Sequence, residues 1–494
     1  MSHSAAASNA APDSDVGRYQ RHRPEQTLLY RIVEQHYPAF TAHLAEQGTV
    51  LPGVVQREFE DYLKCGRLEH GFLRVRCDTC HAEHLVAFSC KRRGFCPSCG
   101  ARRMAESAAL LVDEVLPEQP MRQWVLSFPF QLRFLFASRP LILGQVLGIV
   151  YRMIATHLVK KAGLTHKTAR TGAVTLIQRF GSALNLNIHF HMLFLDGVYV
   201  DGSDGSARFR GVKAPSNQEL TPLAHAIARR VGRFLERQGL LERDAENSYL
   251  AGDGMDDDPM MQLLGHSITY RIAVGPQQGR KVFTLQTLPA YDPEEPFGDT
   301  LSKVAGFSLH AGVAARADER KKLERLCRYI ARLAVSEKRL SLTANGNIRY
   351  QLKTPYRDGT THVIFEPLDF IARLAALVPK PRINLTRFHG VFAPNSKHRA
   401  WVTKAARGKG KQAKGSDDPT PAERRASMTW AQRLKRVFNI DIETCPACGG
   451  PVRIIACIED PVVIKKILDH VTDRAAAGER RPLPESRAPP GLFD

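Results

Sequence analysis

The chain has 494 residues, 43% of them hydrophobic and 24% charged, which is ordinary for a soluble globular protein and long enough for two to four domains. Its 70 lysines and arginines against 50 acidic residues give a net charge of +20, which favours nucleic acid as a partner over an anionic membrane surface. Polar and charged residues interrupt the most apolar stretch, 141–159, and the N-terminus lacks an apolar signal region, so we expect a cytoplasmic protein without a membrane span.

Hydrophobic periodicity and turn residues predict an α+β protein. We expect helices over 25–46, 54–63, 102–116, 141–161, 218–238, 317–334 and 367–377. Strands are expected over 123–128, 173–180, 188–195, 267–274, 281–286, 306–313, 348–353 and 362–365. Pro38 is expected to kink or split the first helix. The turn-forming residues around Gly181 predict a hairpin between the second and third strands.

Two Cys-x-x-Cys pairs near the N-terminus have the spacing of a zinc site. Cys77 and Cys80 form the first pair, and Cys96 and Cys99 form the second pair 15 residues later. Four thiolates close a tetrahedron around Zn²⁺ and leave no open position, which is typical of a structural site. The spacing therefore predicts that these four cysteines hold one structural Zn²⁺.

Other cysteines leave the ligand sets open. Cys65 and Cys90 lie close enough in sequence to join this site or to form a second one. Cys445 and Cys448 form one more pair, followed only by Cys457, so zinc binding and a degenerate half-site remain alternatives there. Cations that flank the N-terminal pairs are candidate phosphate contacts, with a solvated surface as the alternative: Lys91, Arg92, Arg93, Arg102 and Arg103.

Two histidines flank one apolar residue in the strand expected over 188–195. Successive side chains of a strand point to opposite faces, so His189 and His191 share a face while Phe190 enters the core. Neighbouring imidazoles on one face are good ligands for a divalent metal. A pair of half-buried structural histidines is the alternative.

A tyrosine surrounded by arginines lies in the helix expected over 317–334. Arg325 and Arg332 are spaced to neighbour Tyr329 on one helical face, and Arg328 precedes it. Cations beside a phenol favour the phenolate and would also hold a phosphate. Together with the histidine pair, this pattern suggests attack by Tyr329 on a metal-polarised phosphodiester.

With these motifs the chain resembles a known family, the rolling-circle transposases of the HUH endonuclease superfamily. Within that family it is similar to the insertion-sequence ninety-one-like group, which includes the common-region elements. The matching segments occur in order over roughly residues 25–400 and are Phe95–Cys99, Arg179–Asn185, His189–His191, Asp196–Val198, Phe307–Gly312, Leu326–Arg332, Asp358–Thr360 and Phe388–Pro394.

The resemblance implies a catalytic domain with a palm-like central antiparallel sheet flanked by helices. It implies that Tyr329 cuts one DNA strand at the element ends and keeps the 5′ end as a phosphotyrosine. Mg²⁺ or Mn²⁺ on His189 and His191 would polarise the scissile phosphate. A third ligand is expected, for which Gln178 is preferred and His310 and Asn185 are alternatives.

One departure from some relatives concerns the number of tyrosines. Those relatives carry a second tyrosine one helical turn after the first, where this chain has Leu333. We therefore interpret the chain as a single-tyrosine enzyme. Tyr350 and Tyr356 are interpreted as structural.

The expected domain order follows from these assignments. It runs from a disordered tail (1–20) through an N-terminal zinc-binding, DNA-binding domain (21–118), the catalytic domain (119–396), a basic linker (397–438) and a small zinc-ribbon-like module (439–475) to a second tail (476–494). Partners are expected to be single-stranded terminal DNA sequences of a bacterial mobile element, with action at the nucleoid. An HUH plasmid initiator or relaxase and a non-catalytic zinc-dependent DNA-binding regulator remain alternatives.

Overall fold

The computed structural model describes residues 17–18, 23–201, 207–243, 248–250, 258–287, 301–405, 440–441 and 443–476. They belong to two compact units. The larger unit comprises Arg23–Cys65 and Ser89–Ala426, and the smaller one comprises Met1–His22, Gly66–Phe88 and Ser427–Asp494. Most of the two predicted tails, and the predicted basic linker after residue 405, lie outside the described residues.

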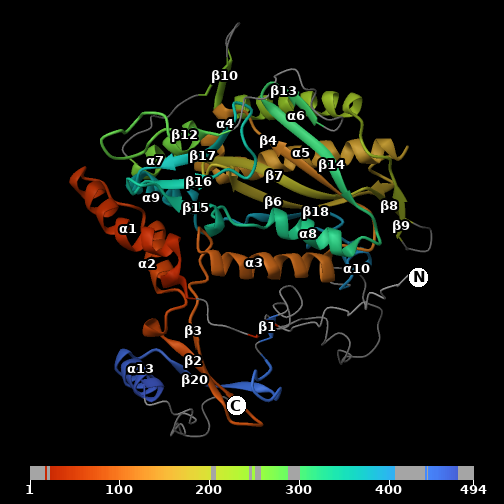
Figure 1. Ribbon diagram of the computed structural model, residues 1–494. Helices are drawn as coiled ribbons and strands as arrows, with labels where there is room; N and C mark the ends of the chain where they lie inside the picture. Colours follow the sequence, from red (N-terminus) through yellow and green to blue (C-terminus); the bar gives the residue numbers. More distant parts are fainter. Residues whose placement is uncertain are drawn as a thin grey trace, which may run out of the picture. The chain divides into compact units, whose positions relative to one another are not determined.

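A six-stranded antiparallel sheet forms the centre of the larger unit (Figure 1). Two neighbouring strands of this sheet, Gly172–Phe180 and Leu186–Leu195, form the predicted hairpin, in which Gln178 is paired with His189 and Ile177 with Phe190. The strand order across the sheet is β13 (Leu301–Val304), β14 (Phe307–Ala315), β4 (Met121–Ser127), β7 (Leu186–Leu195), β6 (Gly172–Phe180) and β18 (Thr386–Gly390).

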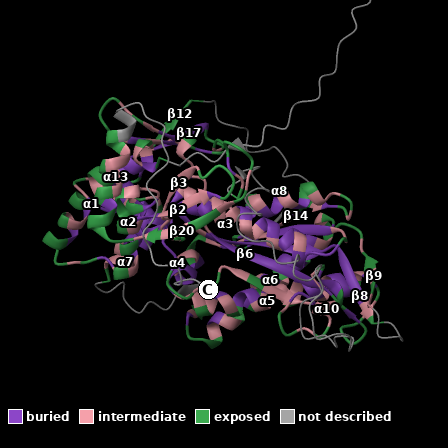
Figure 2. Ribbon diagram, turned by 90° about the horizontal axis from the view of Figure 1, so that it is seen from below, coloured by how far each residue is buried: buried purple, intermediate pink, exposed green. Residues whose placement is uncertain are grey.

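The two faces of this sheet carry separate apolar cores, because side chains alternate along each strand. Figure 2 shows that the strands of this region, such as β6, are largely buried. Ile188, Phe190 and Met192 of β7 face the larger core. Leu193 and Leu195 face the smaller core on the opposite side. The larger core is covered by α4 (Phe130–Ser138), α5 (Pro140–Lys161), α6 (Asn217–Arg237) and α7 (Pro259–Thr269), and the smaller core by α3 (Pro97–Leu110), a π-helical turn (Leu111–Val115) and α8 (Arg320–Ile330).

The remaining described elements of the larger unit are two smaller sheets, one strand pair, four helices and two short 3₁₀ turns. A four-stranded sheet contains β12 (Phe283–Gln286), β17 (Thr360–Phe365), β16 (Ile348–Gln351) and β15 (Leu340–Leu342). A three-stranded sheet contains β5 (Ala169–Arg170), β8 (Gly197–Asp201) and β9 (Ala207–Gly211), and β10 (Leu241–Arg243) pairs with β11 (Ser248–Leu250). The other helices are α1 (Leu28–Glu46), α2 (Gly53–Lys64), α9 (Pro367–Leu377) and α10 (Arg399–Val402), with short 3₁₀ turns at Pro24–Gln26 and Glu337–Arg339.

The smaller unit joins segments from both ends of the chain. Its three-stranded sheet has the order β20 (Val452–Ile458), β2 (Phe72–Cys77) and β3 (Glu83–Ala87). A 3₁₀ turn (Leu68–His70) and α13 (Pro461–Ala476) complete it, and β1 (Gly17–Arg18) pairs with β19 (Ile440–Asp441). The C-terminal Cys-x-x-Cys segment therefore shares a sheet with the first N-terminal pair.

Most predicted elements are present, two expectations were wrong in detail, and the predicted split of the first helix at Pro38 does not occur. The stretch 267–274 is not a strand, because α7 continues to Thr269 with Ile268 buried, and the residues after its left-handed cap at Tyr270 form an isolated bridge between Arg271 and Lys281. Pro38 lies inside α1 without dividing it. The helix that carries Tyr329 ends at Ile330 rather than near Ala334.

One described helix, α5, is long and apolar enough to cross a membrane when only length and composition are considered. Half of its most apolar window is buried inside the protein, and buried α5 residues such as Val146, Val150 and Ile154 belong to the larger core. Core helices of globular proteins commonly satisfy the same test, so α5 is weak evidence for a membrane.

A buried ion pair ties three strands of the central sheet together. Arg122 on β4 donates to both carboxylate oxygens of Asp196 at 2.9 and 2.6 Å and to the Ala311 carbonyl at 2.9 Å. Both side chains are about nine-tenths buried.

Replacing Asp196 by alanine is expected to lower the free energy of unfolding by about 3–5 kcal/mol, because Arg122 would stay buried without its counter-charge. Urea unfolding of the full chain would measure this. Asp201 provides the control, since its ion pair with His398 is half exposed and Asp201→Ala should cost less than about 1 kcal/mol. Equal losses in the two variants would contradict the prediction.

Candidate active site and cysteine clusters

The two histidines of β7 lie on one face of the central sheet, as predicted. The Nε2 atoms of His189 and His191 are 3.1 Å apart, and the ring centroids are 4.9 Å apart. Phe190 between them is fully buried in the opposite core. The alternation of the strand therefore converges two imidazole nitrogens on one point.

Gln178 supplies a third donor atom at this point. Its Oε1 lies 3.3 Å from His191 Nε2, and its own amide nitrogen donates to the Ile330 carbonyl at 3.4 Å. His310 is on β14, which is separated from β7 by β4 and so by roughly 10 Å. Asn185 lies against Gly181 in the hairpin loop. Among the three predicted candidates, the structure brings Gln178 to the histidines.

Hydrogen bonds fix the orientation of both imidazoles. His189 Nδ1 is 2.9 Å from the Asn187 carbonyl, which can only accept, so Nδ1 donates and the lone pair belongs to Nε2. The Gln123 amide nitrogen lies 2.6 Å from His191 Nδ1 and can only donate, so Nδ1 accepts and the proton of neutral His191 lies on Nε2, facing His189 Nε2 and Gln178 Oε1. Partners of this kind orient metal-binding histidines. Two imidazole nitrogens and one amide oxygen converge on one point, and they fit a divalent cation once Gln123 turns its amide oxygen toward His191 Nδ1, which moves the His191 proton to that nitrogen.

The electrostatic environment keeps both histidines neutral at physiological pH. Burial lowers the pKa of His189 to about 4, with further lowering by the charges of Arg332 and Arg133. Burial lowers the pKa of His191 to about 2, helped by the charge that His189 would carry if protonated and by the charge of Arg332. Each neutral ring keeps one lone pair, on Nε2 of His189 and, in this arrangement, on Nδ1 of His191.

Tyr329 faces this pair from α8. Its ring centroid is 6.2 Å from that of His191, with the two rings nearly perpendicular, and 38% of the residue is exposed to solvent. The buried residues Leu326, Cys327 and Ile330 anchor α8 on the smaller core, which leaves the intervening Tyr329 at the edge of the site. The predicted tyrosine and histidines thus meet in one place.

Two cations flank the Tyr329 ring. Arg332 Cζ and Lys353 Nζ each lie 4.1 Å from the ring centroid. Burial alone would raise the pKa of Tyr329, but hydrogen bonds and positive charge from Arg332 and Lys353 outweigh burial and lower it. The environment favours the phenolate, which is the nucleophilic form of the side chain.

Lys353 was not predicted, and the other two predicted arginines lie elsewhere on α8. Lys353 follows β16, 24 residues after Tyr329, and no spacing rule connects them. Arg328 pairs with Glu324 at 3.5 Å, and Arg325 is exposed. Arg332 lies just beyond the end of the helix, so its approach to Tyr329 depends on the turn that follows Ile330.

Leu333 occupies the position where some relatives have a second tyrosine. It packs against Gly100 of α3, where an added β-carbon would clash with the Leu333 side chain. Tyr350 is fully buried and donates a hydrogen bond to the Ala334 carbonyl at 3.2 Å. These contacts fix the chain exit after α8.

The first cysteine cluster lies in the larger unit and consists of Cys65, Cys90, Cys96 and Cys99. Sulfur–sulfur distances include 3.7 Å for Cys65–Cys99 and for Cys65–Cys96, and 3.4 Å for Cys90–Cys99. Zn–S bonds of about 2.3 Å in a tetrahedron require sulfurs about 3.8 Å apart. The four thiols therefore fit one Zn²⁺.

The second cluster lies in the smaller unit and consists of Cys77, Cys80, Cys445 and Cys448. Cys77 Sγ is 3.5 Å from Cys448 Sγ, and Cys80 Sγ is 3.6 Å from Cys445 Sγ. The Thr79 and Gly450 amides donate to Cys77 and Cys448, each at 3.4 Å. The two knuckles together form a second four-thiol zinc site.

These clusters correct the predicted ligand set. Cys77, Cys80, Cys96 and Cys99 do not form one site, because each pair completes its tetrahedron with other cysteines. The Cys-x-x-Cys spacing is the same in three pairs, so spacing alone could not determine which pairs meet. The residues left open, Cys65, Cys90, Cys445 and Cys448, supply the missing ligands.

The cations predicted beside the cysteines differ in their surroundings. Arg92 Nε donates to Asp61 at 2.6 Å, and Arg102 pairs with Glu106 at 3.1 Å. Arg103 donates to the Lys91 and Arg92 carbonyls at 3.1 and 3.0 Å, so it braces the loop of the first cluster.

A pocket of about 300 Å³ connects this region to the active site. Arg93 and Arg103 line it from the zinc-binding segment, and Gln178 and Arg332 line it from the catalytic site. The two regions belong to the same compact unit. Two of the predicted cations, Arg93 and Arg103, therefore line the same pocket as Gln178 and Arg332 of the candidate active site.

Two family models match the chain. One, described as "Transposase zinc-binding domain" of the IS91 type, matches residues 32–128, and the other, described as "Putative transposase", matches residues 172–400. The first includes all four ligands of the first cysteine cluster, and the second includes Gln178, His189, His191 and Tyr329. No curated protein and no solved structure matches. The order of the two matched domains and the cysteine clusters show that this chain belongs to the IS91-like transposases.

Proposed function

We propose that this transposase nicks single-stranded DNA at the ends of its element through Tyr329 and then transfers the strand by a rolling-circle mechanism. The observation that supports this most is the position of Tyr329, 6.2 Å from His191 and between two cations. We also propose that the central antiparallel sheet is the palm of an HUH endonuclease, since it carries the histidine pair on a middle strand.

The chemistry would be a transesterification. The Tyr329 phenolate oxygen attacks the scissile phosphorus, the bond from phosphorus to O3′ breaks, and O3′ takes a proton from solvent to become a free 3′-hydroxyl. The 5′ end remains on the protein as a phosphotyrosine. A later attack by a 3′-hydroxyl on this phosphotyrosine would join the strands and release Tyr329.

The side chains around the tyrosine have separate roles in this proposal. His189, His191 and Gln178 would hold Mg²⁺ or Mn²⁺, which when bound supplies a Lewis acid for the phosphate oxygens. Lys353 and Arg332 stabilise the phenolate before attack, and Arg332 is also placed to contact a phosphate. The pocket lined by Arg93 and Arg103 would hold the strand that leads to the site.

The direct test uses labelled single-stranded oligonucleotides from the ends of the element, with Mg²⁺ or Mn²⁺, resolved on a denaturing gel. The wild-type chain should form a covalent adduct, and the His189→Ala/His191→Ala double variant should form none while still binding DNA. Tight DNA binding without an adduct under every metal and oligonucleotide would instead favour a non-catalytic DNA-binding protein. A plasmid origin cut in preference to the element ends would favour a replication initiator or relaxase.

Lys353 is expected to act as a positioning and charge-stabilising residue. Replacing Lys353 by methionine should slow adduct formation by about tenfold to a hundredfold, because one of the two cations at the Tyr329 ring is lost. Lys353→Arg should recover most of the rate. Lys338→Met serves as a control, since Lys338 is an exposed lysine just before β15 of the same small sheet. Equal effects of Lys353→Met and Lys338→Met would refute this role.

A further inference from the structure

Two adjoining hollows lie beside α5 and α6, away from the catalytic residues. The first has a volume of about 560 Å³ and the second about 780 Å³, and they share Arg152 and Arg230. We call them together the α5–α6 groove. Its cationic lining consists of Arg152, Arg170, Arg230, Arg233, Arg237 and Lys397.

The groove is strongly positive and poorly neutralised. All six cations are exposed, and among the described residues that line the two hollows Glu236 is the one acidic side chain. Within the described part of the chain, no ion pair joins any of the six to a carboxylate. Gathered like charges repel one another, and a bound polyanion would relieve that repulsion.

Cations elsewhere on this unit are arranged differently. Arg92 has Asp61 beside it, Arg102 has Glu106, and Lys161 at the end of α5 contacts Glu219 at 2.5 Å. Among the described residues the six cations of the α5–α6 groove have no such partner, so a bound polyanion would supply the missing negative charge.

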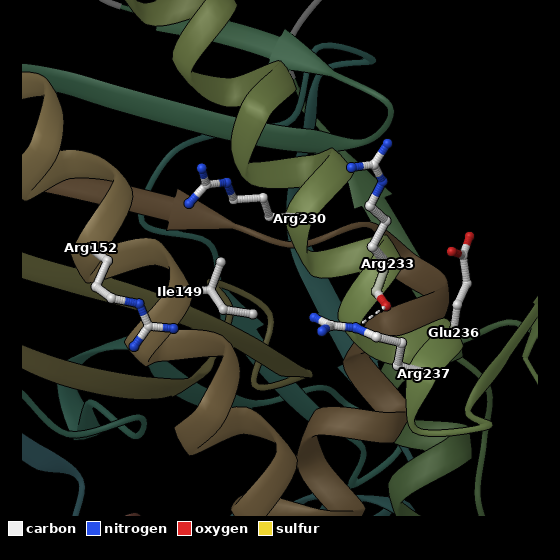
Figure 3. A pocket seen from close by; sticks show the side chains of 6 residues that line it. All are labelled: Ile149, Arg152, Arg230, Arg233, Glu236 and Arg237. Atoms are coloured by element: carbon white, nitrogen blue, oxygen red, sulfur yellow. Dashed lines mark hydrogen bonds between the residues drawn. The ribbon is translucent and has the colours of Figure 1, made fainter.

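The spacing of the arginines suits a phosphate backbone. Arg230, Arg233 and Arg237 are three and four residues apart, so they form one stripe on α6 about 10 Å long. Figure 3 shows Arg230 and Arg237 extending from α6 toward α5, where Arg152 extends from the other wall. A strand rises about 3.4 Å per nucleotide along a duplex axis, so the stripe spans about three phosphates.

The central sheet separates this groove from Tyr329. The helices α5 and α6 pack on the core that contains Phe190, whereas α8 packs on the opposite core with Leu193. A DNA strand held at Tyr329 and a ligand in the groove would therefore occupy opposite faces of one sheet. We propose that the α5–α6 groove binds the phosphodiester backbone of a second DNA segment, without base recognition, while the first is held at Tyr329.

This proposal goes beyond the nicking chemistry and can be tested without it. Full-length protein would be titrated with a labelled random-sequence duplex, or with the corresponding single strand, over a range of KCl concentrations. An excess of a short unlabelled oligonucleotide from an element end would occupy the active site. The variants are the triple substitution Arg230→Gln, Arg233→Gln and Arg237→Gln, and the same three positions changed to lysine.

The triple glutamine variant should bind the labelled DNA at least tenfold more weakly. Its logarithmic salt dependence should fall by about 2.7 if the occupant is duplex and by about 2.1 if it is single-stranded, since each lost phosphate contact removes about 0.9 or about 0.7. The triple lysine variant keeps the charge and should retain most of the slope, which also controls for folding. The triple glutamine variant should still form the Tyr329 adduct on the short oligonucleotide.

Arg229 provides the matched control, because it is exposed on the same helix but does not line the groove. Arg229→Gln should leave the slope nearly unchanged. Three results would each overturn the proposal. The first is wild-type affinity and slope in the triple glutamine variant, and the second is an equal effect of Arg229→Gln per charge. The third is a triple glutamine variant that no longer binds phosphatidylserine vesicles but binds DNA like the wild type. Failure of the wild type to form an adduct would refute the nicking chemistry but leave the salt slopes as a test of the groove.

Discussion

Replacing Tyr329 by phenylalanine should abolish the covalent protein–DNA adduct and leave DNA binding almost unchanged. The substitution removes one oxygen from a ring that stays between Arg332 and Lys353, so the site keeps its shape and its positive charge. Loss of a nucleophile typically lowers the rate of covalent chemistry by about 10³-fold or more. Gel-shift affinity and adduct yield on the same end-derived oligonucleotide would measure the two effects separately.

Two other tyrosines serve as controls for this variant. Tyr356→Phe should form the adduct at the wild-type rate, because Tyr356 lies in the segment between β16 and β17 and we interpret it as a structural residue. Tyr350→Phe should mainly lower stability, since its hydroxyl donates to the Ala334 carbonyl in a fully buried position. Adduct formation by Tyr329→Phe at the wild-type rate would exclude Tyr329 as the nucleophile.

The purified chain is expected to contain two Zn²⁺ ions, one in each cysteine cluster. Cys445→Ser should lose one ion and destabilise the smaller unit, because it breaks the tetrahedron that joins the segment around Cys77 to the C-terminal segment. Binding of a structural Zn²⁺ is worth about 10–16 kcal/mol, so its loss should have one of the largest effects on stability of any single substitution in this chain. Metal content by mass spectrometry and protease resistance of each unit would report the outcome.

The matched variant lies in the other cluster. Cys65→Ser should also lose one ion, but it should destabilise the larger unit, where Cys65 is buried beside Cys96 and Cys99. Cys457→Ser should keep both ions, because Cys457 is exposed and contacts Glu459 rather than a cluster. A single ion retained through both Cys445→Ser and Cys65→Ser would support the ligand set of Cys77, Cys80, Cys96 and Cys99 instead.

Local patterns were sufficient for the elements of the catalytic region. The alternation from Leu186 to Leu195 placed both histidines on one face, because side-chain direction in a strand depends only on position along it. The turn-forming residues around Gly181 predicted the hairpin, which pairs Gln178 with His189. Periodicity also predicted the helices α5 and α6, and both begin and end within a few residues of the predicted bounds.

The end of α8 could not be read from periodicity. Leu326, Cys327 and Ile330 have helical spacing, and the apolar residues Ala334 and Val335 continue that spacing. In the structure Leu333 packs against Gly100 of α3, a residue more than 200 positions earlier in the chain. This contact requires the chain to leave the helix, and it also places Arg332 against the Tyr329 ring.

The sequence by itself identified the candidate residues: the histidine pair, the tyrosine, the eight cysteines that form the two clusters and the excess of cations. Each of these is a property of residue type and short spacing. Only the tertiary structure decided which cysteines share a metal, that Lys353 reaches Tyr329, and that arginines of α5 and α6 line one groove. The physical reason is the same in each case. Thiols, cations and rings interact over a few ångströms. Some of the residues concerned are separated by as many as 371 positions, so their meeting depends on how strands and helices pack rather than on the neighbours of each residue.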